Sequence, residues 1–180
     1  MKLTQETTQV IVYSKRFAES QGGRMISTEP VLAAIAAVDC PAKAILERNG
    51  VTMESICEMI SADDMAIEAP VNDYEIEESL RILRLETKRL FNDAADMSRR
   101  VGMQGVIAPE HLLFILANSR AMTANALLTR AGADIGGIID DLSNEFSNSG
   151  ARGEIGGNYS EAGPELNAPG KSPRKEKGKK

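Results

Sequence analysis

Two stretches of this 180-residue sequence decide its fold: Ile26-Ser27-Thr28-Glu29-Pro30-Val31-Leu32 and Ile107-Ala108-Pro109-Glu110-His111-Leu112-Leu113. In both, an apolar residue precedes a helix start and a second apolar residue lies one turn into the helix, which is the spacing of a hydrophobic staple. A glutamate occupies the first turn each time, where the helix dipole favours a carboxylate. The two stretches therefore predict the same helix start in two copies.

The similarity extends toward the C-terminus from both stretches. Ala42, Ile45, Leu46, Arg48 and Gly50 recur in the same order as Ala124, Leu127, Leu128, Arg130 and Gly132, and Ile56 and Ile60 recur as Ile138 and Leu142. A staple, a helix-start glutamate and a helix-ending glycine in the same order twice indicate a duplication. The sequence predicts an all-α fold made of a tandem pair of four-helix repeats.

Apolar periodicity and capping residues place the helices and the boundaries. We expect repeat one at about 3–61, an acidic linker at 62–74 and repeat two at about 75–146, the whole forming a duplicated domain over 1–146. The expected helices span 4–21, 27–37, 41–49, 52–60, 75–101, 122–131 and 134–146, and a further helix begins at Pro109 and carries Leu112, Leu113 and Leu116. Residues 147–180 are rich in Gly, Ser, Asn, Pro and charge, so we expect a disordered tail or an interdomain linker there.

The composition agrees with a helical fold and limits the classes of partner that the chain can bind. Apolar residues make up 42% of the chain but aromatics only 4%, which suits aliphatic helix packing. Six Lys or Arg against one Glu over 171–180 give that end +5, so the rest carries −5 − 5 = −10. An acidic body argues against nucleic acid as a partner. The polar start and the lack of an apolar span argue against a signal peptide and a membrane, so a cytoplasmic location is expected.

The chain offers little for catalysis or metal binding. Cys40 and Cys57 have no metal-ligand spacing and are expected to be free thiols. His111 lacks Ser, Cys or Asp partners in any triad arrangement, so we expect a structural role for it. Gly170-Lys171-Ser172 lacks the first glycine of a phosphate-binding loop because Glu165 stands at its position. The sequence predicts no enzyme activity, no cofactor and no metal.

The duplicated unit with Glu110-His111-Leu112-Leu113 at a helix start resembles the N-terminal (Clp repeat) domain of Clp-type AAA+ unfoldases. Glu29-Pro30-Val31-Leu32 is a weaker copy of that motif, and Gly22 and Gly102 also fit the family pattern. The resemblance covers about residues 3–145. It implies a domain that binds adaptor proteins and unfolded or phosphoarginine-tagged substrates, in partnership with Clp ATPase modules.

The resemblance also implies four candidate binding residues: Glu29, Glu110, Thr4 and Arg84. Each glutamate matches the family residue that accepts a guanidinium, although both also suit a purely structural helix start. Thr4 matches the hydroxyl on the phosphate side of the site in repeat one. Arg84 stands at the corresponding place in repeat two, where the sequence predicts the middle of a helix. The arginine that follows the hydroxyl in the family is absent, and Glu6 replaces it in repeat one.

We therefore expect the substrate- and adaptor-recognition domain of a Clp-type chaperone or protease system, without its ATPase modules. A stand-alone Clp-repeat regulator that competes for the same adaptors fits the sequence equally well. A helical protein that uses the basic segment Arg174–Lys180 on nucleic acid is a further alternative, which the acidic body disfavours.

Overall fold

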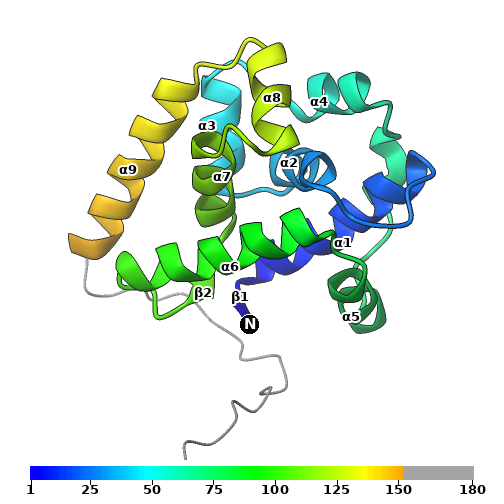
Figure 1. Cartoon of the computed structure of the whole chain (residues 1–180), viewed down its shortest axis with the longest axis horizontal. Coiled ribbons are helices and arrows are strands. Elements are labelled where there is room, and N and C mark those ends of the chain that lie inside the picture. Colours follow the sequence, from blue (N-terminus) through cyan, green and yellow to red (C-terminus); the bar gives the residue numbers. More distant parts are fainter. Residues whose placement is uncertain (152–180) are drawn as a thin grey trace, which may run out of the picture.

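A computed structural model describes residues 1–151 (Figure 1), and the predicted all-α fold is confirmed. The tail residues 152–180, including the Gly170-Lys171-Ser172 stretch and the basic end, lie outside the described residues. In chain order the elements are β1 (Lys2–Leu3), α1 (Gln5–Ser20), α2 (Thr28–Ala37), α3 (Pro41–Arg48), α4 (Met53–Ile60), η1 (Asp64–Ile67), α5 (Asp73–Arg81), α6 (Leu85–Arg100), β2 (Val106–Ile107), α7 (Pro109–Asn118), α8 (Thr123–Arg130) and α9 (Ile135–Ala151).

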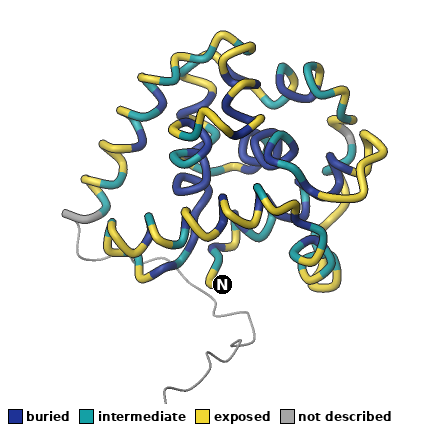
Figure 2. Tube along the Cα trace, viewed as in Figure 1, coloured by how far each residue is buried: buried dark blue, intermediate teal, exposed yellow. Residues whose placement is uncertain are grey.

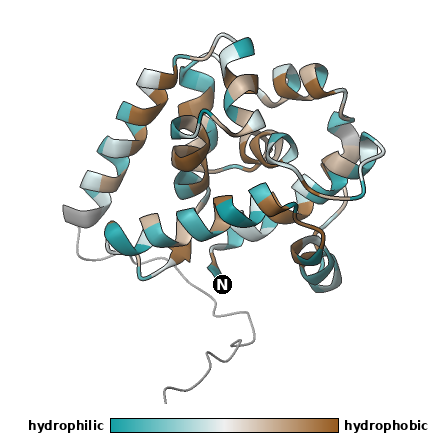
Figure 3. Ribbon diagram, viewed as in Figure 1, coloured by the Kyte–Doolittle hydropathy of each residue, from teal (hydrophilic) through white to brown (hydrophobic). Residues whose placement is uncertain are grey.

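One aliphatic core joins both halves of the chain, and α2 and α7 lie at its centre. Both helices follow the duplicated starts, and six of their long apolar side chains have no solvent exposure: Val31, Leu32, Ile35, Leu112, Leu113 and Leu116. Figure 2 shows α2 as the most continuously buried helix, and Figure 3 shows the same helix as one of the most hydrophobic. The two copies of the predicted staple thus anchor a shared core rather than two separate ones.

Short extended segments, which apolar periodicity does not predict, pair in front of the two central helices. β1 and β2 form a two-stranded parallel sheet in which Leu3 pairs with Ile107. At the equivalent place before α2, Ile26 forms an isolated parallel bridge with Leu83. Leu3, ahead of α1 in the first half, thus pairs with Ile107, ahead of α7 in the second half. Leu83, ahead of α6 in the second half, pairs with Ile26, ahead of α2 in the first half. The halves are therefore crossed at both helix starts.

The long helix predicted over 75–101 is wrong, because α5 ends at Arg81 and α6 begins at Leu85. The intervening backbone bonds to the segment before α2: Ile26 N–H donates to Ile82 O at 2.9 Å, and Arg84 N–H donates to Ile26 O at 2.9 Å. These bonds occupy groups that an unbroken helix would need for its own ladder. Arg84 is consequently the N-cap residue of α6 and not a mid-helix residue, which places it where Thr4 stands before α1.

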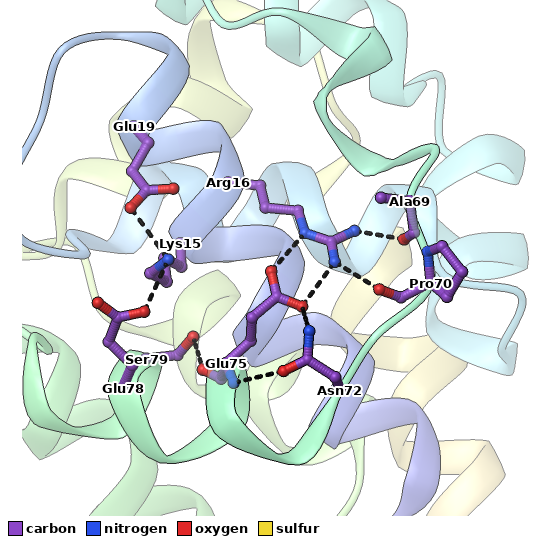
Figure 4. A network of polar contacts seen from close by, with 9 residues as sticks. All are labelled: Lys15, Arg16, Glu19, Ala69, Pro70, Asn72, Glu75, Glu78 and Ser79. Atoms are coloured by element: carbon purple, nitrogen blue, oxygen red, sulfur yellow. Dashed lines mark hydrogen bonds and ion pairs between the residues drawn. The ribbon is translucent and has the colours of Figure 1, made fainter.

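The linker between α4 and α5 is fixed to α1 by two buried cations (Figure 4). The Arg16 guanidinium donates to both carboxylate oxygens of Glu75, at 3.1 and 2.8 Å, and to the carbonyls of Ala69 and Pro70. Next to it, the Lys15 ammonium lies 3.0 Å from carboxylate oxygens of both Glu19 and Glu78. The Arg16 guanidinium holds the pKa of Glu75 below its usual value. The linker is thus attached to α1 through two backbone carbonyls, and α5 through the carboxylates of Glu75 and Glu78.

The C-terminal helix α9 is longer than predicted and continues to Ala151, so 147–151 belong to a helix and not to a tail. Its first two turns pack on the end of α3, where Asn49 Nδ2 donates to Asp141 Oδ2 at 3.1 Å. Toward its other end the ring of Phe146 stacks on His111, with ring centroids 5.3 Å apart. Within residues 1–151 no single helix is long and apolar enough to cross a membrane. Taken together, α7 and α8 meet that length and composition, with a bend of 82° between them.

Candidate functional site

The four candidate residues form two clusters, and each cluster contains one residue from each half of the chain. Thr4 N–H donates to Ile107 O at 3.0 Å, which places Thr4 beside the helix that carries Glu110. Arg84 N–H donates to Ile26 O, which places Arg84 beside the helix that carries Glu29. The sequence comparison assigned Thr4 to the Glu29 half and Arg84 to the Glu110 half. The structure contradicts that pairing, because the N-terminal end of each first helix lies against the start of the other half's central helix, although α1 packs mainly on α2 and α6 on α7.

Matching threonines hold both crossings in place. Thr7 Oγ1 donates to Ile107 O at 2.7 Å, and Thr87 Oγ1 donates to Ile26 O at 2.8 Å. Both threonines are fully buried. They lie three residues after Thr4 and Arg84, so a common register joins the starts of α1 and α6. That register was the sequence signal that could have revealed the break before α6.

The Thr4 side chain is already engaged within α1. Its hydroxyl oxygen accepts from Thr7 N–H at 3.2 Å and lies 3.0 Å from the Thr7 hydroxyl, so Thr4 acts as the helix N-cap. Arg84 has no such capping role, and its side chain is exposed to solvent. Of these two residues, Arg84 is therefore the one whose polar group is available to a ligand.

Glu110 is a buried carboxylate with an internal partner. It is 9% exposed, and its Oε1 accepts from Ala42 N–H, in the first turn of α3, at 3.2 Å. Burial raises the pKa of this carboxyl, and the charges of Glu145 and Glu6 act in the same direction. The hydrogen bond from Ala42 partly offsets both effects. Glu110 thus caps a helix of the other half at the cost of a desolvated charge.

Glu29 occupies the equivalent position in α2 but lacks such a partner. Its Oε2 atom is buried and, within the described residues, accepts no hydrogen bond. The neighbouring donors at the start of α8 are already taken: Ala124 N–H donates to Thr28 Oγ1, and Thr123 N–H donates to Glu86 Oε1, both at 3.2 Å. A buried carboxylate oxygen without a donor loses free energy, so this site favours a cationic or N–H-bearing ligand group.

His111 has the structural role that the sequence indicates. Its Nδ1 accepts from Ala108 N–H at 2.9 Å, in front of α7, and its ring is fully buried against Phe146. Burial lowers the pKa of His111 to about 4, so the imidazole is neutral at physiological pH. The Nε2 atom is buried and has no partner among the described residues.

The two cysteines are free, Cys57 being buried and Cys40 half-buried at the N-cap of α3. Burial raises the pKa of both thiols to about 11, so neither is an activated nucleophile. Over residues 1–151, with the side chains of uncertain placement set aside, no group of three or more His, Cys, Asp or Glu could hold a metal ion.

Comparisons with known proteins agree with this architecture. No family model matches the chain. In sequence it is 28% identical over 141 residues to the chaperone protein ClpD of the Arabidopsis thaliana chloroplast, and this match covers 74% of the chain. The chain spans only 15% of the length of that relative.

A solved structure gives the same result for the fold. The crystal structure of the N-terminal domain of the caseinolytic protease-associated chaperone ClpD, from Arabidopsis thaliana, superposes with a TM-score of 0.60 at 24% identity. The match covers 81% of this chain and 95% of the solved one. The resemblance read from the duplicated helix starts is confirmed, and the chain has the all-helical fold of a Clp N-terminal domain.

Proposed function

We propose that the chain is the substrate- and adaptor-recognition domain of a Clp-type ATP-dependent chaperone or protease system, and that it acts by binding and not by catalysis. The ATPase modules with which it works lie outside these 180 residues. The similarity to the ClpD N-terminal domain supports the chaperone assignment. The neutral, buried His111 and the protonated thiols support a binding role because none of them is prepared for chemistry.

The observation that carries the proposal is the buried Oε2 atom of Glu29, which has no donor. We propose that it accepts the guanidinium of an arginine or phosphoarginine side chain on an unfolded substrate or an adaptor. Charge-assisted hydrogen bonds of this kind are among the strong ones in proteins. We propose that Arg84, which is exposed at the start of α6 and whose N–H bonds to Ile26 O just before α2, meets an anionic group beside that guanidinium.

The experiment is a calorimetric titration of the chain with a permanently unfolded polypeptide and with peptides that carry a single arginine or a single phosphoarginine. Wild type is compared with Glu29→Ala and with Glu47→Ala, a matched control on the exposed face of α3. Loss of the charge-assisted bonds at Glu29 should weaken binding by about 1.5–3 kcal/mol, whereas Glu47→Ala should bind as wild type does.

The alternative, that Glu29 is only a helix-start acid, makes a different prediction. Glu29→Ala would then lower stability by about 0.3–1 kcal/mol through the lost dipole interaction and leave binding unchanged. Equal binding of every ligand by all three proteins would exclude Glu29 as the site. Failure of wild type to bind the unfolded polypeptide would exclude the recognition function itself.

A further inference from the structure

Glu29 and Glu110 occupy equivalent helix positions, yet one has an internal partner and the other has none. The backbone N–H group that can bond to such a glutamate also occurs at equivalent positions in both halves. Ala42 N–H at the start of α3 and Ala124 N–H at the start of α8 are equivalent, and each points at an acceptor from the other half. Ala42 donates to Glu110, whereas Ala124 donates to Thr28 instead of to Glu29.

The residue before each glutamate accounts for the difference. Thr28, before Glu29, is fully buried, and its hydroxyl accepts from Ala124 N–H and lies 2.9 Å from the Thr123 hydroxyl. Pro109, before Glu110, has no hydroxyl to offer. At the α3 start the glutamate itself must therefore satisfy the orphan N–H, because a helix N-terminus buried without an acceptor is unfavourable.

We propose that Thr28 and Pro109 set the number of binding sites to one. Thr28 caps α8 and so leaves Glu29 free to accept a cationic ligand group, whereas Pro109 commits Glu110 to the cap of α3. The domain then binds one arginine-bearing segment per chain, at Glu29, despite carrying two equivalent glutamates. The inference rests on the proposed function for the identity of the ligand, but the cap of α3 can be tested without any ligand.

The binding test is a calorimetric titration with the phosphoarginine peptide, read for stoichiometry as well as for affinity. Wild type should bind one peptide per chain, and Glu110→Ala should keep that stoichiometry and affinity. Thr28→Val, which preserves shape but removes the hydroxyl, should weaken binding at least tenfold although Glu29 is intact, because Glu29 is then drawn to Ala124 N–H. Pro109→Thr should release Glu110 and raise the stoichiometry to two.

The inference would be overturned if wild type bound two peptides per chain. It would also be overturned if Thr28→Val kept wild-type affinity while Glu29→Ala abolished binding, or if folded Pro109→Thr bound only one peptide. Thr8→Val is a matched control, because the Thr8 hydroxyl donates to Thr4 O at the start of the same helix. It should bind as wild type does, so that loss in Thr28→Val is not a general effect of removing a hydroxyl.

The thermal midpoint of unfolding and amide exchange test the caps without ligand. Glu110→Ala should lower the midpoint and speed exchange at Ala42 N–H, whereas Glu110→Gln, which retains an acceptor, should restore most of both. Glu29→Ala should leave exchange at Ala124 unchanged. If wild type binds no peptide, the proposed function fails, and these measurements still decide the inference. Equal loss of stability in Glu29→Ala and Glu110→Ala would overturn it.

Discussion

The His111 imidazole is a residue-scale example of burial that sets a charge state. The unfolded chain binds a proton at His111 below about pH 6.5, whereas the folded chain holds its pKa at about 4. Because the folded pKa is depressed, the unfolded state takes up the proton first as pH falls. Stability attributable to the neutral ring is therefore complete above pH 6.5 and is lost as the pH falls toward 4.

We predict a fall of up to about 3 kcal/mol in the free energy of unfolding between pH 6.5 and pH 4, as an upper bound from the size of the shift. His111→Gln can still accept from Ala108 N–H but does not titrate, so its stability should change over this range only through other groups, such as the carboxyls of Glu75 and Glu110, and should lack the fall due to the imidazole. Urea unfolding curves at half-unit pH steps give the comparison. A wild-type slope equal to that of His111→Gln would show that the ring is not held neutral by the fold.

At the same scale, the sequence located Glu29 and Glu110 correctly as helix-start acids but could not tell them apart. The Glu29 carboxylate lacks an internal partner because the adjacent residue, Thr28, already accepts the hydrogen bond from Ala124 N–H. Such a bond joins positions 96 residues apart, so local patterning carries no trace of it. The pairing of Thr4 with Glu110 escaped prediction for the same reason, since a crossing of the halves is a tertiary property.

At the scale of elements, amphipathic periodicity and caps predicted most helices, and failures occurred where backbone bonds to another element prevailed. Residues 75–101 have helical periodicity on both sides of Ile82–Arg84, so periodicity alone does not indicate a break. The bonds of Ile26 to Ile82 and Arg84 impose it. The linker was predicted as irregular, but its attachment through Arg16 needs a buried guanidinium facing two carbonyls, which composition does not reveal.

Gly136 and Gly137 at the start of α9 provide the element-scale prediction, because sequence rules treat the two as equal weaknesses in a helix. A Cβ on Gly137 would overlap Asn49 Oδ1 and approach Asp134 Oδ2 to 2.8 Å, whereas one on Gly136 meets only Asp134 Oδ1, at an ordinary 3.5 Å. Asn49 cannot move away freely, since its amide bonds Ile45 O and Asp141.

Gly136→Ala should therefore stabilise the fold by about 0.5–1 kcal/mol through helix propensity. Gly137→Ala should destabilise it by about 1–3 kcal/mol through steric overlap at the contact between α3 and α9. Thermal or urea unfolding of the two variants beside wild type measures both effects. Similar stabilisation by both alanines would mean that α9 does not pack closely on the end of α3.

At the scale of the whole molecule, the two halves bond to each other at several helix starts. Glu110 caps α3, Thr28 caps α8, and Thr7 and Thr87 each donate to a carbonyl of the other half. The aliphatic core is also continuous between the halves. A four-helix half alone would leave these N–H groups uncapped and would expose its side of that core, and chains of about 70 residues have little stability to spare.

We therefore predict that fragments 1–71 and 72–151 do not fold separately. Each fragment alone should have weak helical circular dichroism and no cooperative thermal transition. An equimolar mixture should regain helix content and a cooperative transition whose midpoint rises with concentration, as expected for association coupled to folding. The Arg16–Glu75 pair joins the two fragments, so Glu75→Gln in the second should weaken reassembly, whereas Glu77→Gln, on the exposed face of α5, should not. A cooperative transition in either fragment alone would show that the duplicated unit is an autonomous folding domain and that the crossed caps only adjust its stability.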